Sequence, residues 1–262
     1  SINKHIFTIK NNLNTNGLYI LNNAFNKKKC FLILNQLNNK LFIDRTNNII
    51  KNINLFENNK NIWWIHNYND LLNIKEIQYI ITSEYLLKVA FDYFQCKPIL
   101  HNILFWASYP GNIDTTQQFH QDFDDIKFLK IFIYLNDVND NNGPHVYVKK
   151  SLHNINKIKD IDSKLSQRYD DEIINEKFNN NIINIKGNTG TIIFEDTHGL
   201  HKGTNVKEGQ RFVLQLVYGV STFYYLKNNN YNKYECDINK HKIIYDAFLK
   251  FPYSFMNFTF HQ

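Results

Sequence analysis

The feature that most restricts the fold of this chain is a series of short apolar runs after Pro98, each bounded by Gly, Asn or Asp. The runs read ILHNILFWASY, TTQQFHQDF, FLKIFIYLND, PHVYV, IINIKG, GTIIFED and RFVLQLVYG. Runs of this length, rich in β-branched and aromatic residues and separated by turn formers, are typical of β-strands. Several short strands with regular turns predict a β-sandwich or a barrel.

The rest of the chain mixes helical and strand signals. Apolar residues recur every three or four positions between Asn69 and Gln95, which predicts one or two helices on the outer face of the sheet, with Asn69 or Asp70 as a cap. The runs HIFTI and LYIL favour strands, and CFLILNQLNNKLFI fits either a helix or a hairpin. A polar insertion, roughly residues 151–180, has helical stretches around SKLSQRYDDEIINEKF and is expected to form a substrate lid at the mouth of the sheet.

The length of the chain favours one domain over residues 1–262. A chain of 262 residues can bury a single large core, and no stretch has the composition of a linker. We expect residues 1–97 to form a mixed N-terminal helical support and residues 98–222 the core of strands. Residues 223–262 would then be a C-terminal extension.

Composition excludes several classes of protein. A hydrophobic content of 43% with 15% aromatics excludes a disordered chain. The net charge of +6 is dispersed, so no nucleic-acid partner is expected, although a basic surface would suit an anionic small-molecule substrate. The cysteines Cys30, Cys96 and Cys236 lack CxxC spacing and predict free thiols. No run is long enough to span a membrane and no signal peptide is evident, which favours a cytoplasmic protein of undetermined oligomeric state.

A metal site is indicated by histidines and a carboxylate in two separate segments. His120 and Asp122 lie two residues apart in QQFHQDFDD, and alternation along a strand would place them on one face. A second histidine would come from DTHGLHKGTNVKEGQR, which contains His198 and His201. Two histidines and one carboxylate leave three coordination positions open, the arrangement of non-haem Fe(II) oxygenases.

An arginine follows this second segment. Arg211 begins the strand-like run RFVLQLVYG, ten residues after His201. The planar guanidinium binds a carboxylate through two parallel hydrogen bonds. The sequence therefore predicts that a cosubstrate carrying a carboxylate binds beside the metal.

With these residues the chain resembles the phytanoyl-CoA dioxygenase family of Fe(II)/2-oxoglutarate oxygenases. The resemblance rests on QFHQDFD, LKIFIYLNDV, NGPHVYVKKSLH and DTHGLHKGTN with GQRFVLQLVYG, in the order of the family and over roughly residues 100–220. It implies a mainly β fold with flanking helices, built on a double-stranded β-helix of the jelly-roll type. It also implies that His120, Asp122 and His201 bind the iron and that Arg211 binds the distal carboxylate of 2-oxoglutarate.

The chain departs from the family pattern in two places. Lys149 and Lys150 precede Ser151 where the family commonly has a Pro-Gly pair. Gly203 stands two residues after His201, where the family often has a hydroxyl residue, and the hydroxyl here is that of Thr204.

Other candidate ligands are weaker. His201 is preferred to His198 because the distal histidine of the family precedes a short Lys-Gly or Gly-Ser stretch and lies ten or eleven residues before the arginine. His145 and His153 follow Gly143-Pro144 and are expected to shape the entrance. Asp124 and Asp125 fit turn residues, or residues that support the ligands.

Strand alternation predicts which side chains share the pocket. Val213, Gln215 and Val217 should share the face of Arg211, while Phe212, Leu214, Leu216 and Tyr218 face the helices. Leu129, Ile131, Ile133 and Leu135 form one aliphatic face, so Lys130 and Tyr134 on the other are expected to reach the cosubstrate. Gln118 should lie beside His120, and Trp63, Trp64 and Trp106 should be core or pocket wall.

The resemblance implies an Fe(II)- and 2-oxoglutarate-dependent dioxygenase that consumes O2 and releases succinate and CO2. Hydroxylation of an unactivated C–H bond in a small-molecule or carrier-linked substrate is the expected reaction. The related halogenases lack the carboxylate that Asp122 supplies here, and desaturation or ring closure stays open. The alternatives are a non-catalytic jelly-roll binding module and a cupin-type metalloenzyme that does not use 2-oxoglutarate.

Overall fold

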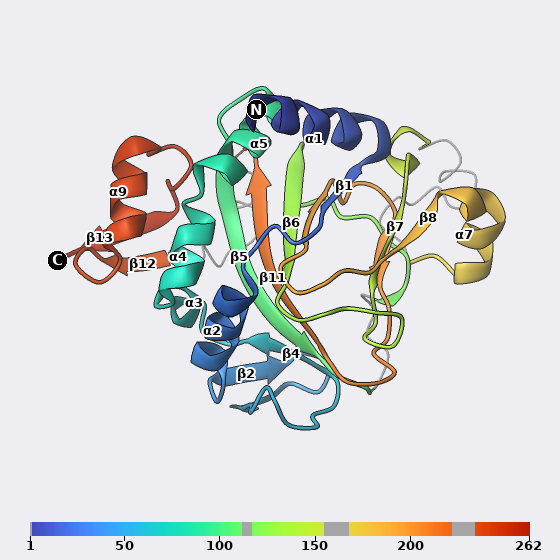
Figure 1. Cartoon of the computed structure of the whole chain (residues 1–262), viewed down its shortest axis with the longest axis horizontal. Helices are drawn as coiled ribbons and strands as arrows, with labels where there is room; N and C mark the ends of the chain where they lie inside the picture. The colour runs from blue at the N-terminus through green and yellow to red at the C-terminus, as the bar shows by residue number, and fades with distance from the viewer. Residues whose placement is uncertain (1, 112–116, 155–167, 222–233) are drawn as a thin grey trace.

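The computed structural model describes residues 2–111, 117–154, 168–221 and 234–262, and in these ranges two antiparallel sheets lie face to face (Figure 1). The larger sheet has, in spatial order, β1 (Leu18–Leu21), β9 (Ile192–Glu195), β6 (Phe128–Tyr134), β11 (Arg211–Gly219), β5 (Ile99–Ser108), β4 (Ile62–Ile65), β2 (Leu41–Asp44) and β3 (Ile49–Asn52). The smaller sheet has β10 (His201–Gly203), β7 (His145–Val148) and β8 (Ile182–Ile185). This is the predicted jelly-roll core.

Helices cover the outer face of the larger sheet. They are α1 (Ile2–Asn16), α2 (Lys27–Leu37), α3 (Asn69–Leu72), α4 (Lys75–Ile81) and α5 (Glu84–Phe94). The C-terminal segment adds α9 (Lys242–Lys250) and the parallel pair β12 (Tyr234–Asp237) and β13 (Phe258–His261), and it packs on the same side. Figure 1 shows β7 and β8 on the side away from α2 to α4. None of the described helices is long and apolar enough to cross a membrane.

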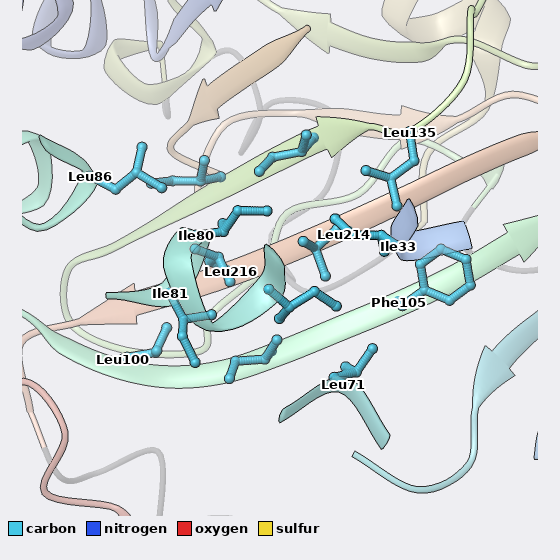
Figure 2. Packing of buried hydrophobic residues seen from close by; sticks show 14 of the residues in the cluster. Ile33, Leu71, Ile80, Ile81, Leu86, Leu100, Phe105, Leu135, Leu214 and Leu216 are labelled. Carbon is cyan, nitrogen blue, oxygen red and sulfur yellow. The ribbon is translucent and has the colours of Figure 1, made fainter. Parts of the chain in front are cut away.

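Each central strand divides its side chains between two cores, as alternation predicts. Leu214 and Leu216 of β11 join Phe105 and the helix residues Ile80 and Ile81 in the outer core (Figure 2). The intervening side chains face the smaller sheet, where Val213, Phe132 and Tyr134 pack with Tyr147 and Ile185. Because the outer core is apolar and covered by helices, the charged side chains of β6 and β11, Lys130 and Arg211, lie in the space between the sheets.

Several local expectations are corrected. The run HIFTI belongs to α1, because the buried side chains Ile6, Ile9 and Leu13 fall at helical spacing. The ambiguous run CFLILNQLNNKLFI divides into the end of α2 and the strand β2. Residues 69–95 form three helices, and the residue before the first is Tyr68 without a side-chain cap, so neither Asn69 nor Asp70 is the cap.

Two segments near the expected site also differ from the prediction. The run TTQQFHQDF is not a strand in its described part, residues 117–123, where Phe119 bridges Tyr169 and His120 bridges His201 in isolation. The predicted insertion contains α7 (Asp171–Phe178) and the single-turn helices Ser151–His153 and Asn179–Asn181. Residues 155–167, on which the rest of the lid expectation falls, lie outside the described residues.

Candidate metal centre

A cavity of about 190 Å³ opens between the two sheets. Both sheets line it, with Ile62, Trp64, Leu104, Trp106, Lys130, Phe132, Tyr134, Arg211, Val213 and Gln215 from the larger sheet, His145, His201 and Gly203 from the smaller, and Arg45, His120 and Asp122 from connecting segments. A larger hollow of about 680 Å³ lies between α5 and the segment after α9, and no histidine lines it. The chemistry-bearing side chains therefore gather in the smaller cavity.

The two histidines and the carboxylate of the predicted site converge. Backbone hydrogen bonds of 3.0 Å in both directions between His120 and His201 place the two imidazoles 4.3 Å apart, centroid to centroid. The carboxylate of Asp122 lies between them, with Oδ2 3.1 Å from His201 Nε2 and Oδ1 3.9 Å from His120 Nε2. One ligand atom from each residue lies within 4.8 Å of the others, which is the spacing that a single metal ion needs.

Backbone carbonyls orient both imidazoles. His120 Nδ1 lies 2.8 Å from the carbonyl oxygen of Gln118, and His201 Nδ1 lies 3.0 Å from that of Gly199. A carbonyl only accepts hydrogen bonds, so each Nδ1 carries the proton and each Nε2 offers a lone pair, as in most metal-binding histidines. The donor set and its tautomers fit a divalent transition metal.

Gln118 contributes to this arrangement only through its backbone. Its side chain is exposed and does not line the cavity, contrary to the expectation from strand alternation. The reason is that residues 117–122 make isolated bridges and not a continuous strand, so the two-residue repeat does not hold there.

Lys130 fixes the carboxylate of the site. Its Nζ lies 2.5 Å from Asp122 Oδ2 and 3.0 Å from Asp124 Oδ2. Burial alone would raise the pKa of Asp122, but Lys130 and the two histidines hold it well below its usual range. Burial would likewise lower the pKa of Lys130, and the two carboxylates raise it. Asp122 is thus ionised, and Lys130 is engaged by carboxylates of the protein.

The pKa values of the two histidines shift in opposite directions. Burial, and then the neighbouring His201, lower the pKa of His120 to about 3, so His120 is neutral at pH 7. Burial would also lower the pKa of His201, but the adjacent Asp122 carboxylate raises it. A cation held between the three groups would face the Nε2 atoms of both histidines and the carboxylate of Asp122.

Arg211, at the start of β11, is buried in the cavity wall with unsatisfied donors. It is 5% exposed, its Nη2 lies 3.5 Å from Ser108 Oγ, and its Nε and Nη1 have no hydrogen-bond partner among the described residues. Burial lowers its pKa, which stays far above neutrality because a guanidinium keeps its proton in proteins. A buried charge without a counter-charge costs free energy, so this guanidinium is suited to an anionic ligand.

Tyr134 and His145 both line the cavity. The Tyr134 hydroxyl donates to the carbonyl of Ile185 at 2.8 Å and accepts from the backbone N–H of His145 at 3.2 Å. Its proton is therefore not free for a cosubstrate. The Nε2 of His145 lies 2.9 Å from Glu195 Oε1.

Glu195 is the residue of this region that sequence reasoning missed. It is fully buried beside Lys130 in the register of β6 and β9, and burial raises its pKa to about 8. Burial also holds the pKa of His145 well below its usual range. The close contact is therefore a hydrogen bond between a carboxylic acid and a neutral imidazole at pH 7. The available signal was an acidic pair, Glu195 and Asp196, directly after the apolar run TIIF.

The remaining candidates lie outside the metal centre. His198 is held by Asp196 Oδ1 at 2.8 Å, and His153 is exposed with its Nε2 near the carbonyl of Asn14. Asp125 binds the backbone N–H groups of Val220 and Ser221.

The tryptophans divide as expected, with Trp63 in the outer core and Trp64 and Trp106 in the cavity wall. The hydroxyl of Thr204 donates to Pro144, and Gly203 lines the cavity.

The fold and the site together define a jelly-roll protein with a candidate metal centre between its sheets. No protein-family profile matches the chain, and no characterised protein matches it in sequence.

Solved structures share the fold at low identity. HygX from Streptomyces hygroscopicus with nickel and 2-oxoglutarate bound has 13% identity and a TM-score of 0.57, over 80% of this chain and 85% of that chain. The epimerase SnoN in complex with Fe3+, alpha ketoglutarate and nogalamycin RO has 9% identity and a TM-score of 0.56, over 82% and 84%. EctD from S. alaskensis with 2-oxoglutarate and 5-hydroxyectoine has 16% identity and a TM-score of 0.55, over 80% and 74%. At these identities the likeness establishes the fold.

Proposed function

We propose that this protein is an Fe(II)- and 2-oxoglutarate-dependent dioxygenase that hydroxylates an unactivated C–H bond of a small-molecule or carrier-linked substrate. The observation that carries the proposal is the pairing, in one cavity, of the His120–Asp122–His201 cluster with a buried guanidinium whose donors are unsatisfied. The bound iron or nickel and 2-oxoglutarate of the structural neighbours support it. Membership of the phytanoyl-CoA dioxygenase family is part of the same proposal and rests on the sequence motifs.

The residues that line the cavity indicate where each cofactor would bind. His120, Asp122 and His201 would hold Fe(II), and Arg211 would hold the distal carboxylate of 2-oxoglutarate. When bound, Fe(II), 2-oxoglutarate and O2 supply the oxidising power, with release of succinate and CO2. Three protein ligands on one face leave room for the cosubstrate and for O2.

The chain itself contributes orientation and the exclusion of water. Lys130 fixes Asp122 through the oxygen that also approaches His201, and the carbonyls of Gln118 and Gly199 fix the imidazole rings. Phe132 and Val213 form an apolar wall between the metal centre and Arg211. Such a wall keeps the substrate hydrogen in place and limits side reactions with water.

The carboxylate of Asp122 favours hydroxylation over halogenation, because it occupies the position that a halide would need. One of the structural neighbours is an epimerase, so this fold supports more than one outcome. The position of the substrate hydrogen relative to the metal decides between hydroxylation, desaturation and ring closure.

The test is succinate formation by the protein with Fe(II), 2-oxoglutarate and O2 across a metabolite library, with His201→Ala as the blank. We expect substrate-stimulated succinate that is lost in His201→Ala. An Arg211→Ala variant should lose affinity for 2-oxoglutarate by roughly tenfold or more, the value of a charge-assisted bidentate contact. A non-catalytic module would give no succinate with any compound. A cupin-type enzyme would turn over without 2-oxoglutarate and tolerate Arg211→Ala.

A further inference from the structure

The order of strands in the larger sheet divides the cavity into a side lined by β6 and β11 and a side lined by β5 and β4. Across the larger sheet, Trp64 pairs with Trp106, Trp106 with Val213, and Val213 with Tyr134. A parallel row pairs Leu104 with Gln215 and Gln215 with Phe132. Lys130 of β6 binds the Asp122 carboxylate, so the metal centre lies over the inner face of β6, and Arg211 begins the adjacent β11. The cosubstrate, running from the metal to Arg211, would cover these two strands.

The inner face of β5 and β4 is then left for another molecule. Its wall is aromatic, since Trp64 and Trp106 lie 4.8 Å apart, centroid to centroid, at an interplanar angle of 32°. Trp106 in turn meets the edge of Phe132 at 6.2 Å, and Phe132 lies 5.1 Å from the His145 ring. The rings make a continuous apolar surface from the outer strands to the metal centre.

Arg45 stands at the outer end of this surface. It follows β2, its side chain is exposed, and its Cζ lies 4.3 Å from the centre of the Trp64 ring. Its other contact in the described ranges is the Tyr68 hydroxyl at 3.4 Å, and no carboxylate of those ranges forms an ion pair with it. The stacked guanidinium thus keeps most of its N–H donors available to a ligand in the cavity.

We infer that Arg45, Trp64 and Trp106 form the substrate subsite, which binds a molecule with a flat apolar body and a terminal oxyanion, a carboxylate or a phosphate. The body lies against the two indole rings, and the oxyanion binds Arg45. The opposite end of the body then points along Phe132 towards the metal centre. This inference rests on the proposed function for the identity of the reaction, but the binding step needs neither iron nor turnover.

The experiment measures the dissociation constants of three matched probes by tryptophan fluorescence and ligand-observed NMR. The probes are 3-phenylpropanoate, 3-phenylpropyl phosphate and the neutral 3-phenylpropanol, which share one aromatic body. Arg45→Met removes the charge and keeps an apolar stem of similar reach. Lys51→Met is the matched control, because Lys51 stacks on Trp63, in the outer core, at 4.8 Å and does not line the cavity. Arg211→Met reports binding at the cosubstrate position.

We expect the wild-type protein to prefer at least one anionic probe to the neutral one by roughly three- to tenfold, the range for a partly exposed charged contact. Arg45→Met should abolish that preference, while Lys51→Met and Arg211→Met keep it. The better of the two anions identifies the oxyanion. Equal affinities for all three probes in the wild type, or a preference that survives Arg45→Met, would overturn the inference. Loss of the preference in Arg211→Met alone would place the probes at the cosubstrate position and leave the oxygenase proposal intact.

Discussion

Buried charges in this cavity are paired with one another, with one exception. Asp122 is matched by Lys130, and Glu195 is kept neutral beside His145. Among the described residues, Arg211 has the Ser108 hydroxyl as its hydrogen-bond partner and forms no ion pair. Because an unmatched buried charge is costly, we propose that a ligand supplies the missing carboxylate at this guanidinium.

Glu195 should make the free energy of unfolding fall as pH rises, whereas an acid with a lowered pKa makes it rise. Its pKa is raised by burial to about 8, whereas an unfolded glutamate titrates near 4.5. Between these values the folded state binds more protons than the unfolded state, so the free energy of unfolding falls as pH rises from about 5 to about 8 and then levels. In Glu195→Gln the side chain stays neutral at every pH, so this fall in the free energy of unfolding should disappear. Urea unfolding of the wild type and of Glu195→Gln at pH 5, 6.5, 8 and 9 measures the free energy of unfolding at each pH.

A matched control for this prediction is Glu172→Gln, which changes an exposed acid on α7. It should unfold with the pH profile of the wild type. The account of Glu195 is wrong if the difference between the wild type and Glu195→Gln does not change with pH.

Sequence patterns identified residues whose chemistry requires a particular type and spacing. His120, Asp122 and His201 were found because few residue types bind a metal, and Arg211 because a carboxylate needs a planar fork. Glu195 and the exposure of the Gln118 side chain could not be found in this way. Both depend on which segments meet across the cavity, and that is set by contacts distant in sequence.

At the scale of elements, alternation was reliable where both faces of a strand are buried. In β6 and β11 it assigned each side chain to the helical side or the cavity side, because a shift by one residue would place Lys130 or Arg211 in the aliphatic core. It failed for residues 5–9, too short a run to show its period, which packs on the sheet as part of α1. It failed again at Gln118, where the chain approaches the smaller sheet through isolated bridges without forming a strand.

The turn that leads into β9 should be intolerant of any side chain. Gly190 has φ +87°, and a Cβ there would come within 2.0 Å of the Phe25 carbonyl oxygen, which is backbone and cannot move aside. The same turn ties β6, and the segment between β1 and α2, to the strand that carries Glu195, through hydrogen bonds to Tyr134 and Phe25. Gly190→Ala should therefore lower the free energy of unfolding by about 2–4 kcal/mol, from strain and displaced backbone together.

Gly209 offers the comparison for this prediction. Its φ of +71° is similar, but a Cβ there would meet only the Asn142 side chain at 3.0 Å. Gly209→Ala should lose only the left-handed penalty, about 1–2 kcal/mol. Denaturant titration of both variants measures the free energy of unfolding that each one loses. Equal losses in Gly190→Ala and Gly209→Ala would contradict the steric argument.

At the scale of the whole molecule, the strand-like runs predicted a sandwich or a barrel and the family resemblance implied a jelly roll, which the structure has. The sequence did not show that β1 to β4 extend the larger sheet on both of its edges. Those strands come from the first 97 residues, where short polar runs mask their period. Their addition matters for function, because β4 supplies Trp64 and the β2 turn supplies Arg45 to the cavity.

The central claim is that His120, Asp122 and His201, from segments about eighty residues apart, hold one ferrous ion that in turn recruits 2-oxoglutarate. Anaerobic calorimetric titration of Fe(II), followed by 2-oxoglutarate, tests it most directly. His198→Ala is the matched control, because this histidine is three residues from His201 and is held by Asp196 outside the cluster.

We predict one Fe(II) per chain in the wild type and in His198→Ala, with 2-oxoglutarate binding only after iron. In His201→Ala both binding events should be lost or weakened at least tenfold. Iron binding that survives His201→Ala and fails in His198→Ala, or 2-oxoglutarate binding that is indifferent to iron, would contradict the account.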